Sequence, residues 1–463
     1  MGSFSEKIYT LSPHFLQECM VSFYNYMAYS KRYGGKYKKY LNIYYQNNTL
    51  TQKDLKDLQF TKLHNFLNFS KKNSKFYQTL YKNIDISKFT STKDLEKLPI
   101  INKEHLRQEI NSVYTILKDK GSLSKTGGTT GKSLEVLYTH EDVQERFAIL
   151  DNFRNGLGYA LGKKTAWFSG KSLLSSSDLK KNRFWKTDYL YNVRYYSTFH
   201  IHNKYLRYYL ENLIKYQPQY MVGFPSTMYE IAKFGMANAI DFPSHTIKAI
   251  FPTAETITED IRQVLESYFK TNLYNQYASS EGAPFILECK NKKLHLELQS
   301  GVFEVLDPDN KPTNKGRLIV TAFNTHGTPL IRYDIGDEIE LSEETCSCGN
   351  NNPLVKQILG RISDYIYSEE MGKINLGNIS NCLKGVKGII RFQIQQNNID
   401  SILVLIEKDA EVYNLIFENA FTENLRNRLG KKIEIVLKYV DEIAVEKSGK
   451  FRLVKSKITT KIK

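Results

Sequence analysis

Ser124-Lys-Thr-Gly-Gly-Thr-Thr-Gly-Lys-Ser133 is the stretch on which the interpretation of this chain depends. Its glycines have no Cβ, so the backbone can turn tightly and approach an anion closely. The threonines and lysines around them supply hydrogen bonds and positive charge. Gly-rich loops of this composition bind phosphate groups through their backbone N–H groups. The stretch therefore predicts a loop that holds the phosphates of a nucleotide.

A P-loop and a plain surface turn are the alternatives for this loop. Gly131-Lys132-Ser133 supplies the end of a P-loop, but that motif also needs a glycine where Thr126 stands. Gly127 is displaced from that position by one residue. The spacing therefore disfavours a P-loop, and a surface turn stays open on this segment alone.

Length and composition are those of a globular protein with several domains. A chain of 463 residues is too long for one compact core, and its 41% hydrophobic and 25% charged residues are ordinary for a folded protein. No apolar run approaches the length of a membrane-spanning helix, and the amino terminus lacks the apolar region of a signal peptide. A cytoplasmic protein is expected.

The net charge of +16 permits an anionic partner. The lysines are spread over the whole length, however, and no nucleic-acid-binding module is evident. We attribute the charge mainly to background composition, which attracts anionic substrates and indicates no specific nucleic acid. Peripheral association of the Lys/Tyr-rich amino-terminal segment with a membrane stays an alternative.

Hydrophobic periodicity predicts helices in the first 90 residues and an α/β core after them. The clearest helix is expected at 257–270, where Thr258 can cap the amino end. Strands are expected at 248–251, 273–276, 301–306 and 317–323. Beyond a boundary near Gly360, a small α+β domain is expected, with strands at 388–395, 401–407 and 432–439 and a helix at 410–429.

Three cysteines and a histidine form a candidate metal site. Cys346-Ser-Cys348-Gly places two thiols on a turn, and Cys289 and His295 flank a Lys/Asn-rich hairpin tip. Together they would give a Cys₃His set suited to structural zinc. The alternative is four unligated residues in two surface loops.

Further polar motifs lie at the ends of expected elements, and their order is informative. Each is common alone as a cap or a turn, but their joint occurrence in this order favours a functional role over the structural one. They are Gly223–Tyr229, Pro252–Thr256, Tyr274–Gly282, Arg332–Asp337 and Ser448–Arg452.

The order of these motifs resembles the adenylate-forming (acyl-CoA synthetase-like) superfamily, and within it the phenylacetate–CoA ligase-like and capsule-biosynthesis branch. Thr126–Gly131 matches the family's phosphate loop except at Gly127, and Arg332–Asp337 matches its Arg-Tyr-x-x-Gly-Asp motif completely. Tyr277–Glu281 matches Tyr-Gly-x-(Ser/Thr)-Glu, with Ala278 in place of the glycine. The Cys-x-Cys-Gly element is also typical of this branch.

The resemblance implies a large amino-terminal adenylate-forming domain and a small mobile carboxyl-terminal domain. Residues 1–90 would be a helical segment of the large domain, 91–360 its α/β core, and 361–463 the mobile α+β domain. Gly360-Arg361 opens the family's hinge motif, in which Ser363 replaces the usual Asp, so the hinge residue is either Ser363 or Asp364.

The implied activity is adenylation of a carboxylic acid by ATP with release of pyrophosphate, followed by acyl transfer to coenzyme A. Transfer to an amine, such as an amino sugar of a surface polysaccharide, is the alternative. A basic, non-enzymatic protein that binds membrane or nucleic acid is a third, less favoured interpretation.

The implied site residues follow from the matched motifs. Tyr277 would stack on adenine beside Ala254 and Glu255. Ser280 and Glu281 would place Mg²⁺, Asp337 with Arg361 would bind the ribose, and Lys450 would bridge the carboxylate and the α-phosphate. The phosphates of ATP would be held by Thr126, Gly127, Gly128, Thr129, Thr130, Gly131 and Lys132.

Overall fold

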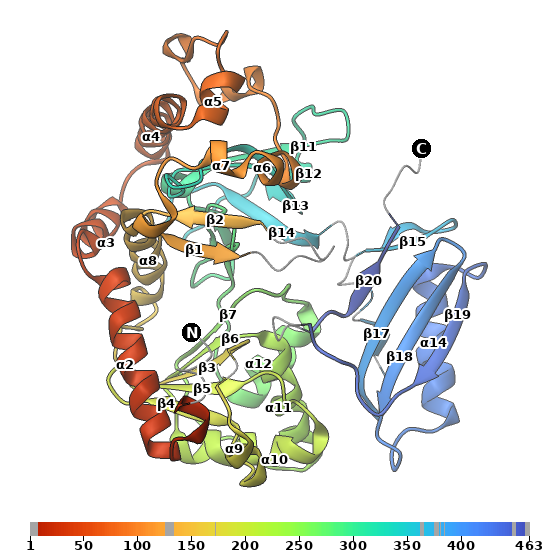
Figure 1. Cartoon of the computed structure of the whole chain (residues 1–463). Coiled ribbons are helices and arrows are strands. Elements are labelled where there is room, and N and C mark those ends of the chain that lie inside the picture. The colour runs from red at the N-terminus through yellow and green to blue at the C-terminus, as the bar shows by residue number, and fades with distance from the viewer. Residues whose placement is uncertain are drawn as a thin grey trace. The chain divides into compact units, whose positions relative to one another are not determined.

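The computed structural model describes residues 8–125, 134–171, 173–361, 365–374, 379, 381–383, 385–446 and 451–458 (Figure 1). The predicted phosphate-loop residues 126–132, the hinge candidates Ser363 and Asp364, and Lys450 therefore lie outside the described residues. The chain forms two compact units. The first contains Met1–Cys19, Lys164–Leu273 and Leu359–Lys463, and the second contains Met20–Lys163 and Tyr274–Ile358.

A five-stranded sheet of order β4-β5-β3-β6-β7 is the centre of the first unit. Four strands run parallel, and β4 pairs antiparallel at the edge. Ala166, Phe168 and Met221 of the inner strands are buried in a core that residues of the helices complete. The strands are β3 (Thr165–Ser169), β4 (Trp185–Asp188), β5 (Val193–Ser197), β6 (Tyr220–Gly223) and β7 (Ala249–Pro252). The helices are α9 (Ser176–Lys180), α10 (Asn203–Tyr216), α11 (Pro225–Ala237) and α12 (Glu259–Phe269).

The direction of winding in this sheet reverses between β3 and β6, since the chain passes from β3 to β5 on one side and then returns to β6 on the other. Open α/β sheets bind ligands at such a reversal, beyond the carboxyl ends of the strands. Gly223 ends β6 there with φ of 128°, and a Cβ on it would lie 1.8 Å from the carbonyl oxygen of Phe168. Only glycine permits this close approach.

A second sheet of the first unit has the order β19-β18-β17-β20 and packs against α14. Its strands β17 (Ile389–Asn398), β18 (Ser401–Lys408) and β19 (Glu434–Tyr439) agree with the predicted ones, and β20 (Val454–Ser456) completes it. The predicted helix at 410–429 begins later, because the Asn414 side chain caps α14 (Leu415–Leu429). Short strands β15 (Ile366–Ser368) and β16 (Gly372–Ile374) form a separate hairpin, and a 3₁₀ turn covers Asn381–Leu383.

The second unit is built on a seven-stranded sheet of order β11-β12-β13-β14-β10-β9-β8. These strands are β8 (Gln276–Tyr277), β9 (Ile286–Glu288), β10 (Leu294–Leu296), β11 (Gly301–Leu306), β12 (Lys315–Ala322), β13 (Leu330–Ser342) and β14 (Leu354–Arg361). The prediction of a strand at 273–276 was largely wrong: Leu273 forms only an isolated bridge to Ile250, and β8 begins at Gln276.

Helices dominate the amino-terminal part of the chain, as predicted. They are α2 (His14–Tyr33), α3 (Tyr37–Asn47), α4 (Gln52–Asn73), α5 (Lys75–Leu80), α6 (Lys103–Gln108), α7 (Ile110–Val113) and α8 (His140–Asn155). On α4, Leu55, Leu63 and Phe66 are buried in the main core of the second unit. The chain thus has the mixed α/β fold that the sequence predicts.

Candidate active site

The predicted phosphate loop is bounded by two paired strands. β1 (Ser122–Lys125) and β2 (Glu135–Tyr138) run antiparallel, with Lys125 opposite Glu135. A P-loop leads from a strand directly into a helix, whereas a strand follows this loop. The P-loop alternative is therefore excluded by the flanking elements, and the phosphate-binding role of residues 126–132 stays a prediction.

Two of the predicted nucleotide-binding residues meet in the second unit. The hydroxyl of Tyr277 on β8 donates a hydrogen bond to Oδ2 of Asp337 on β13 at 2.5 Å, although the residues are 60 positions apart. Asp337 is buried and Tyr277 is half-buried. An aromatic ring and a carboxylate that accepts hydrogen bonds are thus fixed side by side, which suits adenine stacking and ribose recognition.

The rest of the Arg332–Asp337 motif builds the strand that presents Asp337. The guanidinium of Arg332 forms an ion pair with Glu304 at 2.9 Å and donates a hydrogen bond to the carbonyl oxygen of Leu98 at 2.6 Å. Asp334 pairs with Arg317 at 2.7 Å and accepts from the backbone N–H of Gly336 at 3.0 Å. These two charged residues therefore stabilise the strand and its turn.

Ser280 and Glu281 lie in a tight turn after β8. The hydroxyl of Tyr138 donates to the Ser280 carbonyl oxygen at 2.9 Å, and burial raises the pKa of Tyr138 to about 12, which keeps this donor protonated. Gly282 has φ of 103°, and a Cβ on it would lie 2.5 Å from Cγ2 of Thr325. The turn thus holds the Glu281 carboxylate in a buried position, and a buried carboxylate requires a cation or hydrogen-bond donors.

Two further predicted segments meet in the first unit. Glu255, after β7, accepts hydrogen bonds from the backbone N–H and the hydroxyl of Ser226, both at 3.0 Å. Ala254 has φ of 69°, in the left-handed region that alanine rarely adopts. The backbone N–H of Phe451 also donates to Glu255 at 3.3 Å, so the residue after Lys450 contacts the predicted adenine loop.

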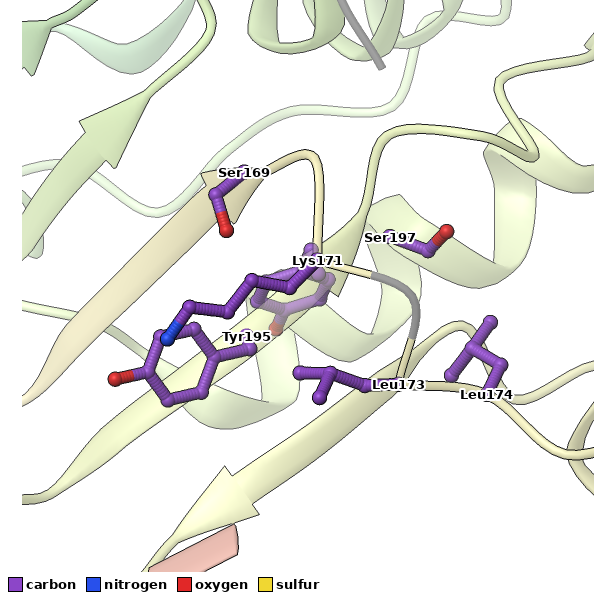
Figure 2. Close-up of a pocket in the computed structure, with 7 residues that line it drawn as sticks. Ser169, Lys171, Leu173, Leu174, Tyr195 and Ser197 are labelled. Carbon is purple, nitrogen blue, oxygen red and sulfur yellow. The ribbon is translucent and has the colours of Figure 1, made fainter. Parts of the chain in front are cut away.

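A small hollow at the carboxyl ends of β3 and β5 was not predicted from the sequence. Figure 2 shows Lys171 beside Tyr195 there, and the Lys171 ammonium lies 4.6 Å from the centre of the Tyr195 ring. Its lining consists of Ser169, Lys171, Leu173, Leu174, Tyr195, Tyr196 and Ser197.

The predicted metal ligands come together in the second unit. The ligand atoms of Cys289, His295, Cys346 and Cys348 all lie within 4.8 Å of one another. The sulfurs of Cys289 and Cys346 are 3.7 Å apart, and Cys348 Sγ is 3.5 Å from His295 Nε2. Tetrahedral zinc with its usual bond lengths requires about 3.8 Å between two sulfurs and about 3.5 Å between sulfur and nitrogen. We call this group the Cys₃His cluster, and its geometry fits such an ion.

Hydrogen bonds outside the cluster orient its ligands. Nδ1 of His295 lies 3.0 Å from the carbonyl oxygen of Asn352, which places the proton on Nδ1 and leaves Nε2 to ligate. Burial lowers the pKa of His295, which also favours the neutral imidazole. The backbone N–H of Asn350 approaches Cys348 Sγ at 3.4 Å. The two segments that carry these four residues therefore meet, and ligation of a metal by them stays a prediction.

Comparisons with known proteins agree with this fold. The crystal structure of 2-hydroxyisobutyryl-CoA ligase in the postadenylation state, in complex with 2-HIB-AMP, superposes with a TM-score of 0.72 at 16% identity, covering 89% of this chain and 91% of that one. The phenylacetate-coenzyme A ligase of Thermus thermophilus is 22% identical over 342 residues, 69% of this chain and 73% of that protein. The chain has the fold of the adenylate-forming ligases, as the resemblance implied.

A closer likeness gives the family. Residues 366–457 match the family described as the CapK C-terminal domain. Protein CapK of Staphylococcus aureus is 34% identical over 451 residues, which are 96% of this chain and 98% of that protein. The chain belongs to the CapK family. Within the described part of the chain, none of the helices has the length and apolar character needed to cross a membrane.

Proposed function

We propose that this ligase activates a carboxylic acid with ATP and Mg²⁺ and then transfers the acyl group to coenzyme A. A carboxylate oxygen attacks the α-phosphorus, the bond from that phosphorus to the β-phosphate oxygen breaks, and pyrophosphate leaves. The thiolate of coenzyme A then attacks the acyl carbon, and AMP leaves. The observation that carries this proposal is the contact of Tyr277 with Asp337, which joins two motifs of the nucleotide site.

The side chains proposed to bind ATP are held in place by hydrogen bonds within the protein. The Tyr277 ring would lie against adenine, and Asp337 would accept hydrogen bonds from the ribose hydroxyls. Ala254 and Glu255 would lie along the adenine, since the bonds to Ser226 fix their loop. Arg361, the last residue of β14, would assist at the ribose.

Charge stabilisation would supply the rate enhancement, because phosphoryl transfer needs positioning and positive charge more than a general base. Ser280 and Glu281 would hold Mg²⁺, which prefers carboxylate and phosphate oxygens and neutralises the developing charge. Lys450 would bridge the substrate carboxylate and the α-phosphate, and the contact of Phe451 with Glu255 supports this role. The loop 126–132 would hold the departing phosphates.

For the Cys₃His cluster we propose a structural Zn²⁺. The ligand distances, the orienting bond to Asn352 and the three thiols all suit this ion, and a fourth protein ligand leaves no position for a substrate. Metal analysis of the purified protein should find about one zinc per chain. Protein that is fully folded and metal-free would contradict the assignment.

Coenzyme A is favoured over an amine as the acceptor because the phenylacetate and 2-hydroxyisobutyryl enzymes named above are both CoA ligases. Since ATP and coenzyme A are cytoplasmic metabolites, the same proposal places the reaction in the cytoplasm. The test is to incubate the enzyme with ATP, Mg²⁺, a panel of aryl, acyl and amino acids, and either coenzyme A or amino sugars. Mass spectrometry should detect AMP and an acyl-CoA thioester. An amide formed from an amino sugar, with no thioester from any acid, would show that the acceptor is an amine.

A further inference from the structure

Helix α2 is partly inverted relative to an ordinary surface helix, because several of its polar residues are buried and several of its large apolar residues are exposed, although Val21 and Tyr29 are buried. Gln17 and Glu18 are 1% and 4% exposed, whereas Phe15 and Phe23 are 63% and 62% exposed. Ser22 and Asn25 are buried as well. Surface helices of globular proteins show the opposite pattern. The exposed apolar residues of this segment are Leu11, Phe15, Leu16, Phe23, Tyr24, Tyr26 and Met27.

Hydrogen bonds to the edge of the five-stranded sheet fix this orientation. Glu18 accepts from the backbone N–H of Thr187 on β4 at 2.8 Å and from the hydroxyl of Tyr189 at 2.6 Å. Gln17 accepts a hydrogen bond from Lys186, which is fully buried and paired with Asp178 at 2.8 Å. Rotation of α2 to bury its aromatic face would break these bonds and leave buried charges unpaired. The apolar face is therefore held outward.

The exposed side chains form one continuous face. Phe15, Cys19, Phe23 and Tyr26 follow one another at intervals of four, four and three residues, which places them along one side of a helix. All four are exposed. A contiguous apolar surface of this kind marks a contact with a partner or a membrane. We call it the α2 aromatic face.

Basic residues follow this face in the sequence, and the one acidic residue of α2, Glu18, is buried and accepts a hydrogen bond from β4. From Cys19 to Lys53 the chain has no Asp or Glu (Figure 1, α2 to the start of α4). Lys31, Lys38 and Lys39 in this segment are exposed. Aromatic and apolar residues beside lysines are the composition of helices that lie in the interface of an anionic bilayer.

We propose that the α2 aromatic face binds peripherally to the surface of an anionic membrane, with Phe15 and Phe23 inserted among the headgroups. The charge favours this occupant over a second copy of the chain, because two copies, each with a net charge of +16, would bring like-charged segments together. An acidic protein would also attract the basic residues. A membrane, however, accommodates a row of large exposed aromatic side chains without needing pockets of matching shape.

Vesicle flotation tests this proposal with the full-length protein. The protein is mixed with phosphatidylcholine vesicles with or without phosphatidylglycerol, and the bound fraction is measured at low and high salt. We expect binding only to the anionic vesicles, weakened by salt. The double variant Phe15→Ser/Phe23→Ser should bind at least about tenfold more weakly, since two inserted aromatic side chains are lost.

The matched control is Leu415→Ser/Ile416→Ser, which removes two similarly exposed apolar side chains from α14. It should bind as the original protein does, and thermal melting should show that both double variants are folded. Equal binding to neutral and anionic vesicles, or equal loss in both double variants, would overturn the proposal. A dimer in light scattering that only Phe15→Ser/Phe23→Ser converts to monomer would also overturn it, in favour of a second copy.

Discussion

The Tyr277–Asp337 pair and the Cys₃His cluster lie in the same compact unit, and both join residues that are distant in sequence. They differ in what their geometry is suited to bind. The first is a hydrogen bond between protein groups on two strands, beside which a nucleotide can add further bonds. The second brings three thiols and an imidazole to the spacing of a tetrahedral metal site. Under the proposed function, the first pair serves chemistry and the second serves folding.

The largest effect on the rate of adenylation is expected from substitution of Lys450. Lys450→Ala removes the positive charge that stabilises the transferring phosphate, so adenylation should fall by about 10²–10³-fold. The melting temperature should not change. The control is Lys457→Ala, which removes an exposed lysine from the same segment and should leave the rate unchanged. Full activity in Lys450→Ala would remove this residue from its assigned role.

A substitution in the Cys₃His cluster should lower stability and leave activity nearly unchanged. Cys348→Ser removes a metal ligand, so the free energy of unfolding should fall by about 3 kcal/mol or more and bound zinc should be lost. The specific activity of the protein that remains folded should stay within about twofold of the original value, since none of the four ligands is among the proposed substrate-binding residues.

Cys19→Ser is the matched control for this variant, because Cys19 is exposed and outside the cluster. It should change neither zinc content nor stability. If Cys348→Ser instead slowed adenylation while stability and zinc content stayed constant, the division between the two sites would be wrong.

Asp337→Ala tests whether the Tyr277–Asp337 pair binds the nucleotide. Loss of hydrogen bonds between a carboxylate and the ribose should raise KM for ATP by about tenfold to a hundredfold. Steady-state kinetics with ATP varied and the acid saturating will measure this change. A KM that rises equally for the carboxylic acid would mean that Asp337 affects the whole site and does not specifically bind ribose.

The smallest effect is expected for Tyr277→Phe. This variant keeps the ring for stacking on adenine and removes only the hydroxyl that donates to Asp337. KM for ATP should change by no more than about tenfold, because a single neutral donor is lost. Tyr277→Ala should be worse by a further factor of about ten, since the ring is also lost. Equal effects of the two substitutions would argue against stacking.

Local patterns predicted the elements whose residues interact within one segment. Thr258 caps α12, as predicted, through a hydrogen bond from the backbone N–H of Ile261 to its hydroxyl. The helix expected from residue 410 begins at Leu415, because the side chain of Asn414 caps its amino end. The residue types of the metal cluster were also evident from the sequence.

Contacts between distant segments were not predictable in the same way. Cys346 and Cys348 reach His295 because β14 pairs with β10 in a register that sets Leu354 opposite His295. The partly inverted α2 depends on hydrogen bonds from β4, which periodicity in a single helix does not reveal. The roles of residues 126–132 and of Lys450 stay predictions, since they rest on motif order.

Exchange of labelled pyrophosphate into ATP, without any acyl acceptor, tests the central claim most directly. Reversible acyl-AMP formation predicts exchange that requires both Mg²⁺ and a carboxylic acid and that falls by about 10²–10³-fold in Lys450→Ala. Failure of every acid in a broad panel to support exchange, with ADP formed in place of AMP, would contradict the claim.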